Sequence, residues 1–520
     1  MFKEIDKVPF IAVVVFFAAL FIFIVASPET AAASMSALME WALENLGWVY
    51  IVCYAFFLIM FLVFGLSGWG KIKLGKPGDA PEFSTPTWIG LLFGAGVGVG
   101  LVFFGVTEPA SFFSEPMYAD PGTPQAASDA MRQSFFHWSF VPWAGYGLAG
   151  LCIAYFRYCK DMPGTVASTL WPLFGSRVFG TLGKIINIFT IVAMVCGISM
   201  SLGYASTQLM AGVEIQYSLP ATIIATCLLV AGITLVAVAS CASGLAKGIK
   251  YVSNLNLWLV VFLIGFGLVC GPTLYIMNAG IQATGDLVAN LPWMITFTDA
   301  DGVISSKLGY NWVSSWTVFY WAWWCAFVPF VGGFLADISK GRTIRELVIA
   351  SLVGPSVICC VWFAVFGGGA IESSLVGGTD VAARAAASQE ASLFVYLQEL
   401  PLAEIIVPVA MLLILTLIIT SMNSAAHVIS STASKHFEPS GFTMAFWLVV
   451  VALFAALFMW LGGLSILRNA AVLLAFPFVI IMVLMTFALL KELSHAGAKA
   501  KELGDEPPEE PLPGAPPLQG

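Results

Sequence analysis

The stretch GLLFGAGVGVGLVFFGVTEP, residues 90–109, decides how this chain is organised. It is apolar enough to cross a bilayer, yet glycine occupies every second position from Gly94 to Gly100. Each glycine in a helix interior costs about 1 kcal/mol relative to alanine. Glycines that pack two membrane helices together recur every four residues along one face, whereas alternation distributes them around the helix. The stretch predicts a span broken near its middle with exposed backbone carbonyls, and close helix packing is the alternative.

The rest of the chain has the composition of a polytopic membrane protein. Of 520 residues, 59% are hydrophobic and only 10% are charged, whereas soluble domains carry about 25% charged residues. Apolar segments of about 20 residues, enough to cross a bilayer, recur twelve times. They lie at 8–26, 48–68, 87–107, 133–156, 186–213, 221–242, 254–276, 312–336, 347–370, 402–427, 443–463 and 467–490.

The basic residues orient these spans. With both termini inside, 18 of the 22 Lys and Arg residues fall in inner segments, as the positive-inside rule expects. The other four, Arg132, Lys307, Arg384 and Arg468, fall in outer segments. We therefore expect a bacterial cytoplasmic membrane protein with cytoplasmic termini, in contact with lipid and not with nucleic acid.

A second interrupted span is predicted at 312–336, where Pro329, Gly332 and Gly333 follow the run YWAWWCAF at 320–327. It is the eighth span and the glycine-rich one is the third, so the offset is five. An odd repeat length inverts topology, as in inverted-repeat transporters. The domains expected are 1–85 with two accessory spans, 86–276 as the first repeat, 277–311 as an outer loop with an interfacial helix, 312–495 as the second repeat, and 496–520 as a disordered acidic, proline-rich tail.

Aromatic residues supply the candidate binding chemistry. Glu108, Glu404 and Asp337 lie at or near predicted span ends, so no midplane acid is expected to bind an amine. The faces of tryptophan rings attract cations and suit quaternary ammonium groups, which have no hydrogen to donate. Packing is the alternative explanation for the run at 320–327 and for HWSFVPWAGY at 137–146. His137 is expected to be a satisfied helix-end histidine.

Three segments resemble the betaine–choline–carnitine transporter family: GAGVGVGLVFFGVTEP (94–109), HWSFVPWAGY (137–146) and FYWAWWCAFVPFVGGFLADISKGRTIRE (319–346). The resemblance covers essentially the whole chain. It implies an all-α protein of twelve transmembrane helices with a LeuT-type core of two inverted five-helix repeats, often a homotrimer. It also implies alternating-access transport of a trimethylammonium or sulfonium zwitterion and no enzymatic activity; the sequence likewise contains no HExxH motif.

Residue by residue, the resemblance implies an aromatic box formed by Trp138, Trp143, Tyr146 and Trp324. Trp321 and Trp323 would line the neighbouring pathway. The family commonly has Trp where this chain has Phe327 and Ser where it has Ala326. Phenylalanine is the weaker cation–π partner, so this departure leaves the substrate open.

The resemblance also implies sodium as the coupling ion and no organic cofactor. The unwound substrate and ion region would comprise Gly94, Ala95, Gly96, Val97, Gly98 and Gly100. The sodium ligands would be Gly94, Val97, Leu417, Thr420 and Ser421. A second sodium ion would lie among Ser199, Ser201 and the ring of Phe330.

These residues favour sodium-driven symport of a solute similar to glycine betaine or dimethylsulfoniopropionate. Proton-coupled family members directed at choline carry Asp where this chain has Gly100. A sodium-independent or proton-coupled choline or carnitine transporter, or an exchanger, is the alternative. The tail lacks the long basic helix of osmotically regulated members, so regulation through the tail is not expected.

Overall fold

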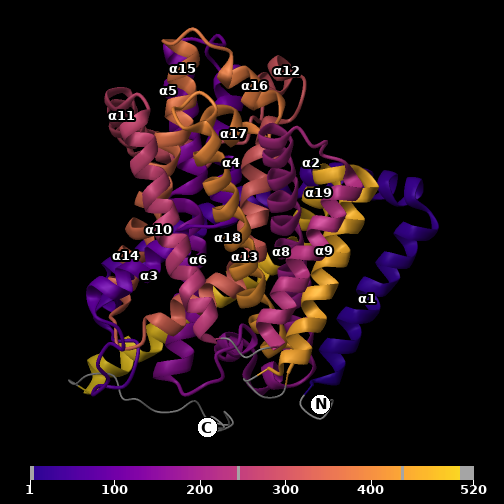
Figure 1. Ribbon diagram of the computed structural model, residues 1–520. Coiled ribbons are helices and arrows are strands. Elements are labelled where there is room, and N and C mark those ends of the chain that lie inside the picture. Colours follow the sequence, from indigo (N-terminus) through magenta and orange to yellow (C-terminus); the bar gives the residue numbers. More distant parts are fainter. Residues whose placement is uncertain (1–4, 243–245, 435–438, 504–520) are drawn as a thin grey trace.

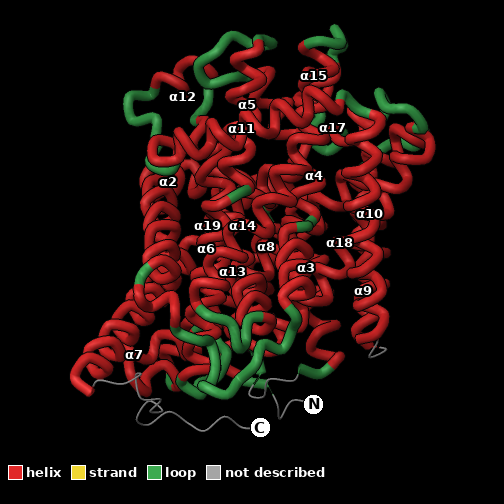
Figure 2. The backbone as a smooth tube through the Cα atoms, turned by 90° about the vertical axis from the view of Figure 1, so that its left-hand side faces the viewer, coloured by secondary structure: helices red, strands yellow, loops and turns green. Residues whose placement is uncertain are grey.

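The structure is a computed structural model that describes residues 5–242, 246–434 and 439–503. Within these residues the fold is helical, and loops gather at its two ends (Figure 2). The first half contains α1 (Lys7–Ala26), α2 (Pro28–Leu66), α3 (Thr85–Gly96), α4 (Val99–Ser114), α5 (Pro124–Trp138), α6 (Phe140–Ala154), α7 (Trp171–Phe174), α8 (Thr181–Tyr217), α9 (Ile223–Ala242) and α10 (Ala246–Cys270). The second half contains α11 (Thr273–Met294), α12 (Val303–Leu308), α13 (Phe319–Ile338), α14 (Ile344–Trp362), α15 (Gly369–Leu375), α16 (Val381–Ala387), α17 (Ser392–Leu397), α18 (Ala403–Thr432) and α19 (Gly441–Leu503).

The chain is a polytopic membrane protein with ten helices long and apolar enough to span a bilayer, or eleven with the bent pair α3–α4, among the residues described. Two predicted spans, 443–463 and 467–490, both fall on α19, whose backbone leaves helical geometry between them at Gly462 and Gly463. The total of twelve, and the repeat and domain boundaries, stay predictions. α1 begins and α19 ends at the same end of the molecule (Figure 1).

The break predicted in the third span is present. The backbone is extended at Val97 (φ −96°, ψ 109°) and Gly98 (φ −140°, ψ 171°), and the flanking helices meet at a bend of 60°. Gly94 and Gly98 have open space where a Cβ would stand. At Gly100, by contrast, a Cβ would collide with Trp323 and lie 3.0 Å from Cη2 of Trp138.

Two neighbouring expectations are corrected. The eighth span is not interrupted at Pro329, because α13 runs through it to Ile338; proline removes one helical hydrogen bond, and the buried packing around α13 maintains the helix. The irregular geometry lies upstream, in the π-helical turn Ser314–Val318. The fourth span is instead divided at Ser139 (φ −106°, ψ −126°) into α5 and α6. Pro142 sits in the first turn of α6, where its missing N–H is not needed.

The family-like sequence GRTIRE caps α14 and ties it to the bundle. Thr343 and Glu346 form a capping box, in which each side chain accepts from the other's backbone N–H. Arg345 donates to the carbonyl of Gly65 at the end of α2. The contacts of GRTIRE therefore have a structural role: they cap α14 and join it to α2.

The predicted outer segment and the predicted tail both contain helix. α11 begins at Thr273 and ends at Met294, so it covers the first part of the segment 277–311, where an interfacial helix is expected. α19 remains helical to Leu503, because AGAKAKEL at 496–503 is rich in strong helix formers. The rest of the predicted disordered tail, 504–520, lies outside the described residues.

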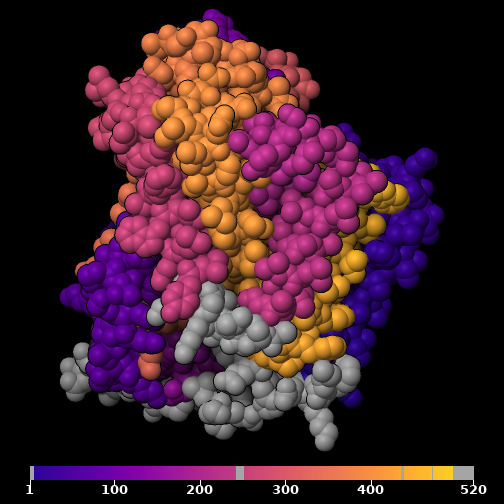
Figure 3. Space-filling model, viewed as in Figure 1, coloured from indigo at the N-terminus to yellow at the C-terminus, as the bar shows by residue number. Residues whose placement is uncertain are grey.

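α18 lies between α10 and α9 on one face of the molecule, as the orange stripe in Figure 3 shows. From there its inward face reaches the centre of the bundle, where it meets the broken pair α3–α4.

Candidate functional site

A cavity of about 420 Å³ lies beside the break between α3 and α4. Its size falls within the range of ligand-binding clefts, about 300–1,000 Å³. Aromatic residues from α5, α6 and α13 form much of its wall. They are Trp138, Trp143, Tyr146, Trp323, Trp324, Phe327, Phe330 and Phe334.

The aromatic box (Trp138, Trp143, Tyr146 and Trp324) is assembled on this wall. The ring of Trp324 lies 4.9 Å from that of Trp138 at 79° and 5.5 Å from that of Tyr146 at 74°. Trp143 and Tyr146 are 5.3 Å apart at 73°. All four residues line the cavity, so their rings adjoin one space. Aromatic rings grouped in this way can attract a cation.

Two residues expected in the site lie away from the cavity. Trp321 stacks on Tyr54 of α2 at 4.9 Å and 16°, so it packs α13 against α2. Ser199 donates its hydroxyl to the carbonyl of Val451 in α19. Of the predicted second sodium site, Ser201 and Phe330 line the cavity and Ser199 does not.

Oxygen-bearing groups gather on the part of the wall formed by α3 and α18. Gly94, Val97, Leu417, Thr420 and Ser421 all line the cavity. Thr420 donates its hydroxyl to the carbonyls of Thr416 (3.0 Å) and Leu417 (2.9 Å). Its oxygen accepts from the amide of Asn256 and keeps a second lone pair available. Hydroxyl and carbonyl oxygens are ligands that hard cations prefer. Ala95, Gly98 and Gly100 also line the cavity, whereas Gly96 ends α3.

α10 contributes polar residues to the cavity that were not predicted from the sequence. Ser253, Asn254 and Asn256 line the cavity beside Ser424. Asn256 is 6% exposed and donates to Thr420 at 3.3 Å, while its Oδ1 has no partner in the described part of the chain. The polar run SNLN inside an apolar span, 253–256, was the signal that pointed to it.

A buried aromatic layer closes the cavity toward the N-terminal end of α13. Phe103 and Tyr204 are 4.5 Å apart, and Trp323 stacks on Phe319 at 5.8 Å and 17°. The guanidinium of Arg468 lies over the ring of Phe319, 3.9 Å from its centroid. Phe334 of α13 and Ser424 of α18 also line the cavity.

Phe327, the position where the family commonly has tryptophan, lines the cavity and meets Trp323 edge-on at 6.3 Å. α8 approaches closely there, because a Cβ on Gly197 would lie 3.0 Å from Ala326 and 3.1 Å from the ring of Phe327. Space at this position is therefore limited by α8.

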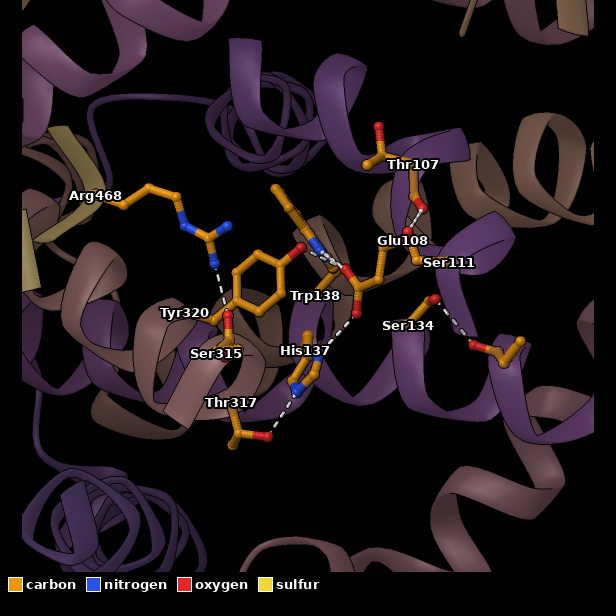
Figure 4. Close-up of polar contacts among 11 residues, drawn as sticks. Thr107, Glu108, Ser111, Ser134, His137, Trp138, Ser315, Thr317, Tyr320 and Arg468 are labelled. Atoms are coloured by element: carbon orange, nitrogen blue, oxygen red, sulfur yellow. Dashed lines mark hydrogen bonds and ion pairs between the residues drawn. The ribbon is translucent and has the colours of Figure 1, made fainter. Parts of the chain in front are cut away.

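A buried acid stands directly behind the box, contrary to the expectation that Glu108 lies at a span end. α4 continues to Ser114, and Glu108 is fully buried. Figure 4 shows its carboxylate meeting the ring of His137, the indole of Trp138 and the hydroxyl of Tyr320. His137 is satisfied, as expected, with Thr317 on its second nitrogen at 3.0 Å.

Comparison with known proteins identifies the family to which this chain belongs. The model of the BCCT family, described as betaine/carnitine/choline family transporters, matches residues 8–498. The chain is a member of the BCCT family. It is therefore a transporter and not an enzyme, as expected.

Individual BCCT relatives are similar over nearly their full length. The glycine betaine transporter OpuD of Bacillus subtilis is 38% identical, over 96% of this chain and 97% of its own. A probable glycine betaine transporter of Desulfitobacterium hafniense is 36% identical, over 90% and 93%. The ectoine/hydroxyectoine transporter of Virgibacillus pantothenticus is 34% identical, over 91% and 94%. All three names describe small zwitterionic solutes, so a betaine-type substrate is supported.

Proposed function

We propose that this BCCT protein imports a quaternary-ammonium or sulfonium zwitterion, glycine betaine in the first instance, by sodium-driven symport. The observation that carries the proposal is the aromatic box on the cavity wall, with Trp324 edge-on to both Trp138 and Tyr146. A trimethylammonium group cannot donate hydrogen bonds, so ring faces are the favourable partners for it. The names of the relatives agree with this substrate class.

Sodium coupling is supported by the oxygen-rich wall beside the break in α3–α4. Carbonyls of the break and hydroxyls of Thr420 and Ser421 adjoin the same cavity as the box. An ion bound there would hold α3 and α18 in one relative position while the substrate is bound. The proposal includes both termini in the cytoplasm of a bacterium and assembly as a homotrimer.

Zwitterion transport is favoured over choline transport by the surroundings of Gly100. An aspartate at this position would collide with Trp323, so it would require the aromatic wall to move. Ectoine is the second candidate substrate, because a relative of similar identity carries that name.

A binding panel tests the proposed substrate. Intrinsic tryptophan fluorescence of the purified protein is titrated with glycine betaine, choline, carnitine, ectoine and dimethylsulfoniopropionate, in sodium and then in potassium buffer. We expect the tightest binding for a betaine-like zwitterion, with weaker binding in potassium. Tightest binding of choline, or equal affinity in both buffers, would contradict the proposal.

A further inference from the structure

Glu108 is a buried acidic residue that has no part in the substrate and sodium binding proposed above. It is 0% exposed, yet it does not line the cavity. Its Oε1 lies 2.6 Å from Nδ1 of His137, and its Oε2 lies 2.8 Å from Nε1 of Trp138 and 2.6 Å from the hydroxyl of Tyr320. Three partners from α5 and α13 therefore meet this one side chain of α4.

The partners show which protonation pattern satisfies the group. An indole N–H can only donate, and a tyrosine hydroxyl or a protonated ring nitrogen can donate as well. If Thr317 donates to Nε2 of His137, the neutral imidazole carries its proton on Nδ1 and directs it at Glu108. All three contacts are then donations to an ionised carboxylate, which needs no proton of its own.

Trp138 connects this carboxylate to the cavity. It is the box residue whose indole N–H is bonded to an acid, whereas the N–H groups of Trp323 and Trp324 have no partner in the part of the chain described. Its ring also lies on the cavity wall, 4.9 Å from the ring of Trp324. One edge of Trp138 thus faces the acid while the ring faces the substrate space.

Two physical effects follow from that bond. Donation to a carboxylate fixes the indole plane more firmly than a neutral hydrogen bond does. The negative charge behind the ring also adds to the attraction between the ring face and a cation, since charges interact strongly in a low-dielectric interior. Because Glu108 itself does not reach the cavity, a substrate ammonium gains this attraction without a direct ion pair or hydrogen bond.

We propose that Glu108 is a positioning and specificity-determining residue that acts through Trp138. Its negative charge attracts a cation to the aromatic box, and its burial leaves amines that carry N–H groups without a carboxylate to which they can donate. This inference rests on the proposed function, in which the box receives a quaternary ammonium. It explains how a binding site can attract a cation and still favour one that has nothing to donate.

A double-mutant cycle tests the proposal. Glu108→Gln, Trp138→Phe and the double variant are purified, and glycine betaine affinity is measured by calorimetry alongside the melting temperature. Each single variant should weaken binding about tenfold, as loss of a hydrogen bond to a charged group does. The double variant should be little weaker than Trp138→Phe, because Glu108→Gln acts through the indole N–H that Trp138→Phe has already removed. Glu492→Gln is the control. It removes the charge of a partly buried acid that forms an ion pair with Lys160.

The outcomes separate the two proposals. Wild-type protein that does not bind glycine betaine contradicts the proposed function before any variant is compared. Wild-type binding combined with unchanged affinity in Glu108→Gln, or with losses that add in the double variant, overturns the role of Glu108. If Glu108→Gln does not fold, Trp138→Phe is compared with Trp324→Phe, because both changes shrink a ring of the box but only the first also removes an indole N–H donated to an acid; equal losses of affinity in the two variants overturn the proposal.

Discussion

At the scale of single residues, recognition depends on which face or edge each tryptophan presents to the cavity. Trp324 contacts Trp138 and Tyr146 edge-on and lies 6.4 Å from Trp143, so it joins all the other members of the box. Trp321 is three positions earlier on the same helix, yet it stacks on Tyr54 and has no part in the cavity wall. The same residue type thus serves binding at one position and packing at the other.

Replacing Trp324 with leucine should weaken glycine betaine binding by about tenfold to thirtyfold, because a desolvated cation–π contact contributes up to about 2 kcal/mol. The Kd measured by fluorescence or calorimetry checks this. Trp447→Leu is the control, since Trp447 is a fully buried tryptophan that packs against Phe10 and Phe446, away from the cavity. Equal losses in the two variants would show that the effect is structural.

The sequence could predict the box tryptophans, because they cluster in two short runs that match a family. It could not predict the role of Glu108. Its partners His137, Trp138 and Tyr320 lie 29, 30 and 212 positions away in the sequence. The span predicted from hydropathy, 87–107, also ended one residue before Glu108. Asn256 was missed for a similar reason, since the polar run SNLN at 253–256 reveals no partner until α18 is placed beside it.

At the scale of elements, composition predicted one break correctly and another wrongly. The alternating glycines of 94–100 do accompany an extended backbone at Val97 and Gly98. Pro329 does not end α13, because proline removes a single hydrogen bond while the packing around it remains. The division of the fourth span at Ser139 has no comparable sequence signal, since serine is common in membrane helices.

Gly100 offers the sharpest test of the broken element. A Cβ there would collide with Trp323 and press on Trp138, so Gly100→Ala should reduce glycine betaine uptake more than tenfold, as displaced binding groups do. Initial uptake rates in cells measure the effect. Gly232→Ala in α9, where a Cβ meets open space, is the control and should leave uptake unchanged. Full activity in Gly100→Ala would mean that the aromatic wall adapts at no cost.

At the scale of the whole molecule, hydropathy and charge were sufficient to predict a helical membrane protein with many spans. They could not fix the number of spans, because α19 combines two predicted ones and α3–α4 divides a third. Nor could they predict that α19 remains helical to Leu503, because helix propensity rather than hydropathy governs that extension.

The tail offers a prediction at this scale. Residues 504–520 are acidic and proline-rich and contain no Lys or Arg, so their sequence lacks the basic groups that bind an anionic membrane surface. Deleting 504–520 should leave the dependence of uptake on external osmolality unchanged within about twofold, whereas removal of a true osmotic sensor abolishes it. Loss of osmotic stimulation in the truncated protein would contradict this expectation.

The central claim is that the aromatic box and the oxygen-rich wall beside it form one sodium-coupled site for a betaine-like zwitterion. Uptake of radiolabelled glycine betaine into proteoliposomes under an inward sodium gradient tests it most directly. The account predicts accumulation above the external concentration that collapses when potassium replaces sodium on both sides. Equal accumulation without sodium, or no accumulation under the gradient, would contradict it.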